Sequence, residues 1–173
     1  ALAVKPSSQF NELMKEHIQK NWKPVIRHGI VFSLVLLYSQ IILGAFMRHA
    51  GAGAACGLGP NSAFLCMDVS TWSYSLWPSM GASQLHMIHR YYGVFVFLVI
   101  SFFLVRTFRF FKNNQRLRWM SLLPLFFISA QVLVGVLALW KNLGIIPKTL
   151  HLAGAALSLA SLPVYEYSAT MVK

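Results

Sequence analysis

The chain has 173 residues, of which 57% are hydrophobic and only 11% are charged. Soluble domains carry about 25% charged residues, so this composition excludes an ordinary soluble surface and favours a membrane protein. The net charge of +11 does not indicate nucleic-acid binding, because the basic residues cluster at the ends of apolar runs. In that position they set membrane orientation and face anionic lipid. The length fits one domain, residues 1–173.

Residues 8–22 predict a short amphipathic helix that lies at the membrane interface. The apolar positions that recur at helical spacing on one face are Phe10, Leu13, Met14 and Ile18. Charged and polar residues fill the opposite face, which is typical of helices that lie in the plane of the membrane surface. A solvated tail is the open alternative.

Four apolar segments follow, each close to the roughly 20 residues that cross about 30 Å of hydrocarbon. We predict membrane helices at about 24–47, 85–105, 119–140 and 147–167. The expected fold class is therefore an all-α integral membrane protein, an antiparallel bundle of four transmembrane helices.

Basic residues precede the first of these helices and fill the link between the second and third. The positive-inside rule then predicts that both termini are cytoplasmic and that the 48–84 loop lies outside a bacterial or archaeal cytoplasmic membrane. The only two cysteines, Cys56 and Cys66, lie in this loop. An extracytoplasmic compartment is oxidising, so a disulfide is favoured over two free thiols.

A weak internal repeat relates the first two membrane helices to the last two. In each pair, a helix with a Gln-x-x-x-Gly pattern precedes a helix with a histidine. The repeated positions are Gln40, Gly44 and His89 in the first pair, and Gln131, Gly135 and His151 in the second. In the antiparallel topology these positions share one depth, near the outer face. We therefore expect two pseudo-symmetric hairpins whose histidines face each other. Glycines on the neighbouring helices leave room for a flat group or simply allow close helix packing.

A histidine inside a membrane segment is costly and is a candidate functional residue. Two imidazoles are the usual axial ligands of a low-spin haem, and helical bundles commonly hold such sites. We therefore predict that His89 and His151 ligate one haem iron, most simply in a b-type haem. Arg90 and Arg48 are the expected partners of the haem propionates, with ordinary interfacial anchoring as the alternative. Lys148 is a weaker candidate.

Four stretches resemble the haem A synthase family. They are GAFMRHAGAGAAC (44–56), HMIHRYYG (86–93), QVLVGVLALW (131–140) and TLHLAGAALSLA (149–160). The resemblance implies a four-helix haem-binding unit with axial ligands at His89 and His151, and a disulfide between Cys56 and Cys66. It also implies oxidation of the haem O methyl group to the formyl group of haem A.

The sequence departs from the family pattern in two ways. Common members carry two such units in tandem, so this chain is expected to form a homo-oligomer or to join a larger membrane complex. The family's first unit usually has a glutamate three residues before the second-helix histidine, and here that residue is His86. His86 is therefore a weak candidate for acid–base catalysis, and Asp68 from the loop is another.

These observations leave the enzymatic role open between a half-size haem A synthase that acts as an oligomer and a non-catalytic cytochrome. The cytochrome would carry one b-type haem and transfer electrons in a larger respiratory membrane complex. A quinone-linked thiol oxidase is disfavoured, because two cysteines ten positions apart do not supply two dithiol pairs. A scaffold without a cofactor is the fourth reading.

Overall fold

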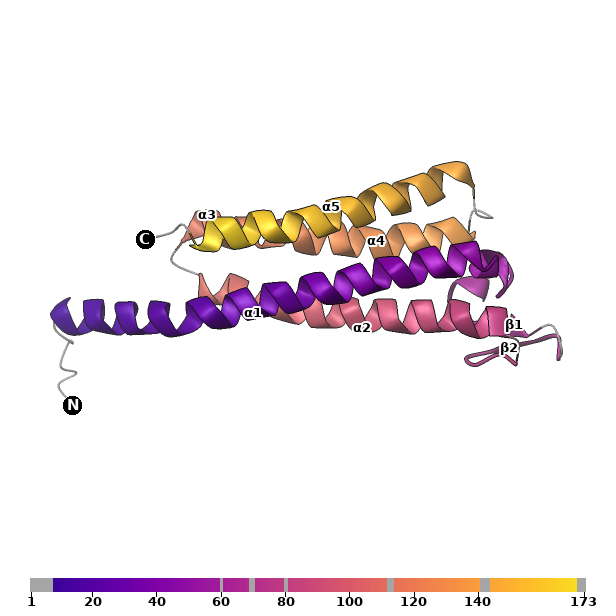
Figure 1. Ribbon diagram of the computed structural model, residues 1–173, viewed down its shortest axis with the longest axis horizontal. Coiled ribbons are helices and arrows are strands. Elements are labelled where there is room, and N and C mark those ends of the chain that lie inside the picture. Colours follow the sequence, from indigo (N-terminus) through magenta and orange to yellow (C-terminus); the bar gives the residue numbers. More distant parts are fainter. Residues whose placement is uncertain are drawn as a thin grey trace.

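The structure is a computed structural model that describes residues 8–59, 61–68, 71–79, 81–111, 114–140 and 144–170, with side chains described between 27 and 164 apart from Ala63. Four long helices run side by side (Figure 1). The helices are α1 (Ser8–His49), α2 (Gly81–Phe110), α3 (Gln115–Met120), α4 (Leu122–Trp140) and α5 (Ile145–Thr170). The loop between α1 and α2 contains two 3-10 turns, η1 (Ala52–Ala54) and η2 (Asn61–Ala63), and two short strands, β1 (Cys66–Asp68) and β2 (Ser73–Ser75). The strands pair antiparallel, with Cys66 opposite Ser75.

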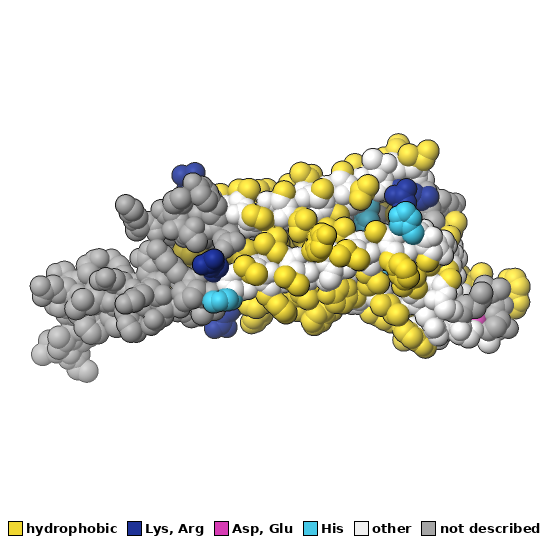
Figure 2. All heavy atoms as spheres, viewed as in Figure 1, with side chains coloured by type: hydrophobic (Ala, Val, Ile, Leu, Met, Phe, Trp, Pro, Cys, Tyr) yellow, Lys and Arg dark blue, Asp and Glu magenta, His cyan; other side chains and the backbone are white. Residues whose placement is uncertain are grey.

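The chain is an integral membrane protein with four spanning helices. The segments that are long and apolar enough are Arg27–His49, Gly81–Phe110, Gln115–Trp140 and Ile145–Val164. Hydrophobic side chains cover the middle of the bundle, and Lys and Arg side chains lie toward its ends (Figure 2). The predicted fold class is therefore confirmed.

The first helix is longer than the sequence indicated. Residues 8–22 are helical, as predicted, but they continue directly into the first membrane span within α1. Pro24 lies between the two segments and has no N–H to donate within the helix, yet α1 runs through it without a break.

The third membrane segment is interrupted near its start, where the sequence predicted one helix from about 119. The helix α3 is capped by Asn114, whose side chain accepts a hydrogen bond from the Leu117 N–H at 3.1 Å, and it ends at Met120. Ser121 separates α3 from α4. The reason is Pro124, which has no N–H to donate to the Met120 carbonyl four residues earlier.

The four long helices occupy the corners of a square. Among the described residues, the packed neighbours are α1 with α2, α2 with α4, α4 with α5, and α5 with α1. Helices α2 and α5 are therefore diagonally opposite. We call the part of the bundle near α3 the α3-side half (27–38, 96–110, 115–128 and 158–164). The part near the 50–79 loop is the loop-side half (39–49, 81–95, 129–140 and 145–157).

The main apolar core lies in the α3-side half. Its buried members are Ile30, Leu36, Leu37, Val96, Ile100, Leu104, Leu117, Ile128 and Leu162. The loop-side half contains the repeated glycine, glutamine and histidine positions, together with the buried apolar residues Met87, Ala138 and Leu139.

Candidate functional site

Each helical hairpin places its histidine against a glycine of the neighbouring helix. A Cβ atom added to Gly44 of α1 would lie 2.9 Å from His89 Cε1 on α2, and one added to Gly135 of α4 would lie 3.3 Å from His151 Cε1 on α5. Real Cβ atoms essentially never approach closer than 3.0 Å. The two imidazoles therefore occupy the space that these glycines leave.

The glutamines of the repeat also face glycines. A Cβ atom at Gly93 would lie 2.8 Å from the Gln40 amide nitrogen. A Cβ atom at Gly154 would meet the amide of Gln131. The Gln–Gly helix and the His–Gly helix therefore interlock in the same way in both hairpins, and the repeat that the sequence showed is present in the packing.

His89 has a well-defined partner in Gln40. The Gln40 amide nitrogen lies 3.2 Å from His89 Nδ1 and donates to the His89 carbonyl oxygen at 3.0 Å. Because an amide N–H can only donate, the Nδ1 atom of His89 accepts in this arrangement. The proton of the neutral ring is then on Nε2, and Nε2 can ligate a metal only when the Gln40 amide presents its oxygen, Oε1, to an Nδ1–H.

His151 is the second histidine of the site, and its Nδ1 atom is buried without a hydrogen-bond partner among the described residues. Leaving a buried polar atom unpaired costs about 1–3 kcal/mol, so such atoms call for a physical explanation. His151 projects from α5, and His89 projects from the diagonally opposite α2. Both predicted histidines thus lie in the loop-side half of the bundle, on helices that are diagonally opposite.

Arg90 supplies a partly buried positive charge beside this pair. Its Nη1 atom donates to the Leu65 carbonyl at 3.5 Å, which is a long hydrogen bond. Its Nε and Nη2 atoms are buried and have no partner among the described residues. Burying a charge is costly unless the charge is paired, so this guanidinium is suited to receive an anion.

The loop between α1 and α2 is bonded to the start of α2, on the side of the site that faces this end of the bundle. The disulfide predicted between Cys56 and Cys66 is present, and both cysteines are fully buried against Met87. Ser83 of α2 donates to the Ala55 carbonyl at 2.9 Å. The disulfide-bonded loop is thereby fastened to the first turns of α2, just before His89.

The other predicted residues are held elsewhere. His86 is buried and its Nδ1–H donates to the Ala52 carbonyl at 3.0 Å, which ties it to the loop. The Asp68 carboxylate accepts from the Ser79 backbone N–H at 2.9 Å and from the Ser79 hydroxyl at 3.0 Å. Arg48 is exposed in the last turn of α1. Catalysis by His86 and propionate binding by Arg48 therefore stay predictions.

Sequence reasoning identified the glutamines only as markers of the repeat. In the structure Gln40 is a direct partner of His89, and its Oε1 atom is buried without a partner among the described residues. Next to it, the hydroxyl groups of Ser39 and Tyr92 lie 2.6 Å apart and link α1 to α2. The four-residue spacing from each glutamine to its glycine was the available signal, because both then lie on one helix face.

Comparison with known proteins gives a consistent match. The COX15-CtaA family, described as cytochrome oxidase assembly protein, matches residues 5–162. A haem A synthase of Orientia tsutsugamushi (strain Ikeda) is 25% identical over 162 residues, which are 92% of this chain and 44% of that protein. A haem A synthase of Oceanobacillus iheyensis is 27% identical over 139 residues, covering 78% of this chain and 40% of that protein. The chain thus spans less than half the length of these relatives.

Proposed function

Because this chain belongs to the COX15-CtaA family of cytochrome oxidase assembly proteins, we propose that it binds one b-type haem between His89 and His151 and serves haem A synthesis as part of an oligomer. The observation that carries the proposal is the pair of imidazoles on diagonally opposite helices, each set against a glycine of its own hairpin. Bis-histidine ligation needs this placement, with one nitrogen donor from each side.

The buried polar atoms of the site fit such a group. His151 Nδ1 and the Arg90 Nε and Nη2 atoms are buried without partners among the described residues. A neutral imidazole can ligate iron, and a guanidinium can pair with a carboxylate such as a haem propionate. The unpaired atoms are thus of the two kinds that a haem would satisfy.

The residues around the histidines have separate roles in this proposal. Gln40 lies against the Nδ1 side of the His89 ring, and ligation through Nε2 would require Nδ1 to carry the proton and donate it to the Gln40 Oε1 atom. Gly44 and Gly135 leave room for the rings. The loop held by the Cys56–Cys66 disulfide is fastened to α2 shortly before His89. A bound haem would supply one-electron redox chemistry, with a potential tuned by these neighbours.

Relatives named haem A synthase are more than twice as long as the aligned region. We propose that this chain works in an assembly, with a second copy of itself or with another membrane subunit. The proposed orientation places the 48–84 loop outside and both termini in the cytoplasm, following the basic residues at the α3 side.

The first test is the absorbance spectrum of the purified protein, reduced minus oxidised. We expect a low-spin haem signal that is lost in His89→Ala and in His151→Ala. His49→Ala is the matched control, because His49 is exposed at the end of α1, and it should keep the signal. Full signal in both site variants would exclude the ligand assignment.

Haem typing separates the enzymatic role from electron transfer. Cells that produce haem O and this protein should accumulate haem A if the oligomer oxidises haem O. Accumulation of haem O alone, with a b-type haem retained in the purified protein, would instead identify an electron-transfer subunit. Pyridine extraction and chromatography distinguish the haems.

A further inference from the structure

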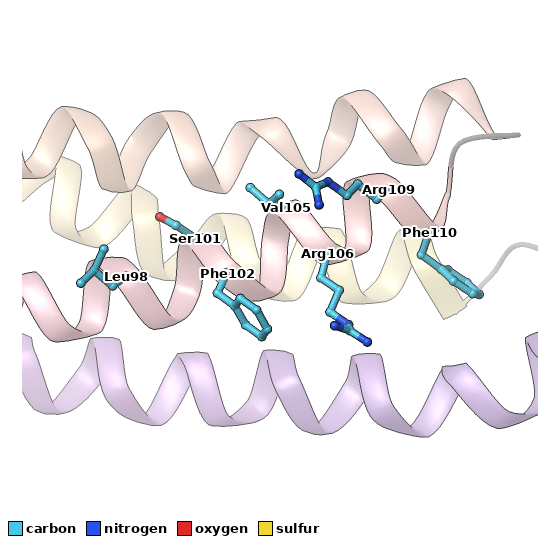
Figure 3. Close-up of a pocket in the computed structure, with 7 residues that line it drawn as sticks. All are labelled: Leu98, Ser101, Phe102, Val105, Arg106, Arg109 and Phe110. Carbon is cyan, nitrogen blue, oxygen red and sulfur yellow. The ribbon is translucent and has the colours of Figure 1, made fainter.

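A hollow of about 590 Å³ lies on the side of α2 away from the histidine pair, in the α3-side half. Its lining residues recur at intervals of three and four, so they form one stripe along the helix. They include Leu98, Ser101, Phe102, Val105, Arg106 and Arg109. In Figure 3 the stripe faces away from α5, with Arg106 directed toward α1 and Arg109 toward the ribbon of α3 and α4.

The stripe is apolar at one end and cationic at the other. Leu98 and Phe102 are 59% and 60% exposed, so they are free to contact a ligand. Arg106 and Arg109 lie one turn apart, close to the end of α2 at Phe110. From Leu98 to Arg109 the helix rises about 16 Å, which matches the roughly 15 Å depth of one leaflet of the hydrocarbon core. The stripe therefore has the length and the polarity of one phospholipid molecule.

Ser101 adds a polar group within the apolar part. Its hydroxyl is buried and has no hydrogen-bond partner among the described residues. Five residues separate it from Arg106, or about 7.5 Å along the helix. The ester oxygens of a phospholipid lie deeper than its phosphate, so they come to the depth of Ser101 along the helix.

We propose that this stripe binds one anionic phospholipid from the leaflet at the α3 side. The phosphate pairs with Arg106 and Arg109, the ester region reaches Ser101, and an acyl chain lies along Leu98 and Phe102. Basic clusters next to membrane helices attract anionic headgroups, and here the hollow adds a place for the chain. This site is separate from the histidine pair and does not depend on the proposed haem.

Native mass spectrometry of the detergent-purified protein can test the site with two probes of equal chain length, phosphatidylglycerol and phosphatidylcholine. We expect the wild-type protein to bind phosphatidylglycerol more tightly. The double variant Arg106→Gln/Arg109→Gln should lower this affinity about 5- to 30-fold, because each cation near the surface contributes roughly a factor of five. Phosphatidylcholine binding should change less than twofold.

Two further variants distinguish a built site from general charge attraction. Arg27→Gln/Arg116→Gln removes two arginines from the same end of the bundle but outside the stripe, and it should leave phosphatidylglycerol affinity within twofold. Val105→Trp keeps the charge but fills the hollow, and it should lower the affinity. The proposal would be overturned if both arginine pairs lowered phosphatidylglycerol affinity equally, or if Val105→Trp left it unchanged. A change of oligomeric state in place of lipid binding would overturn it as well.

Discussion

The two halves of the bundle bury different kinds of side chain, although the same long helices pass through both. The α3-side half buries aliphatic residues such as Ile30, Ile100 and Leu162. The loop-side half brings glycines together with histidines, glutamines and an arginine. Packed aliphatic residues stabilise a fold but do not select a ligand. Polar groups inside a membrane bundle are costly for stability, and they can select a ligand. The difference indicates that stability and binding are divided along the membrane normal.

Unpaired polar atoms sharpen this contrast. In the loop-side half, Gln40 Oε1, Arg90 Nε and Nη2, and His151 Nδ1 are buried without partners among the described residues. In the α3-side half the corresponding described atom is the Ser101 hydroxyl oxygen, which lines the hollow on α2. Native proteins rarely leave such atoms unpaired, so in each half a ligand could supply the missing hydrogen-bond partners.

The largest effect on stability is expected for Ile100→Ala. Ile100 is fully buried in the α3-side core, so its truncation leaves a cavity and lowers the free energy of unfolding by about 2–5 kcal/mol. Ile88→Ala is the matched control on the same helix, because Ile88 is 42% exposed, and it should cost much less. Thermal unfolding in detergent measures both. Equal losses would contradict the assignment of stability to the α3-side half.

The disulfide should be the main stabilising element of the loop. Cys66→Ser removes the cross-link between two residues ten positions apart. In the chain-entropy account this lowers the free energy of unfolding by about 2–3 kcal/mol. The loop should then accept protease cleavage while the helices stay protected, and limited proteolysis followed by mass spectrometry would show it. Adding a reductant to the wild-type protein should reproduce the effect. Unchanged protection of the loop would show that its hydrogen bonds to α2 suffice.

A methyl group at either histidine-facing glycine should disturb the site, and more so where less space is available. Gly44→Ala places a Cβ atom 2.9 Å from His89, whereas Gly135→Ala leaves 3.3 Å to His151. We expect a larger shift of the haem absorbance and a larger loss of haem from the first variant. Gly53→Ala is the control, because nothing lies within 4 Å of its Cβ position. Equal spectra for all three variants would argue against tight packing of the rings.

Removing the glutamine partner should have a moderate effect. Gln40→Leu removes the hydrogen bonds to His89 and costs about 0.5–1.5 kcal/mol of stability. It should also shift the haem midpoint potential, because the partner of a ligand histidine tunes the metal. Gln131→Leu is the pseudo-symmetric comparison. Spectroelectrochemistry measures the shift, and an unchanged potential in Gln40→Leu would remove Gln40 as a positioning residue.

The smallest change in stability is expected for Arg90→Leu. Most of the Arg90 nitrogens have no partner to lose, so the protein without haem should change by less than about 1 kcal/mol. Haem affinity should fall at least about tenfold, because a buried charge pair is lost. Titration with haem tests affinity and thermal unfolding tests stability. A large loss of stability with normal haem binding would make Arg90 a structural residue.

The sequence alone determined the four membrane segments, the cysteine pair and the repeat around the two histidines. An apolar run of about 20 residues forms a helix in lipid, because every backbone polar group must find its hydrogen-bond partner within the segment. The repeat was visible because Gln40 and Gly44, and likewise Gln131 and Gly135, lie on one helix face. These are local properties, and local spacing is enough to show them.

Only the tertiary structure decided which groups these residues meet. Gln40 bonds to His89, His86 bonds to the loop at Ala52, and Arg90 is buried while Arg48 is exposed. Helix rotation and the square packing order set these contacts, and both depend on the summed fit of many side chains from separate helices. No stretch of sequence contains that information by itself, because each contact joins residues far apart in the chain.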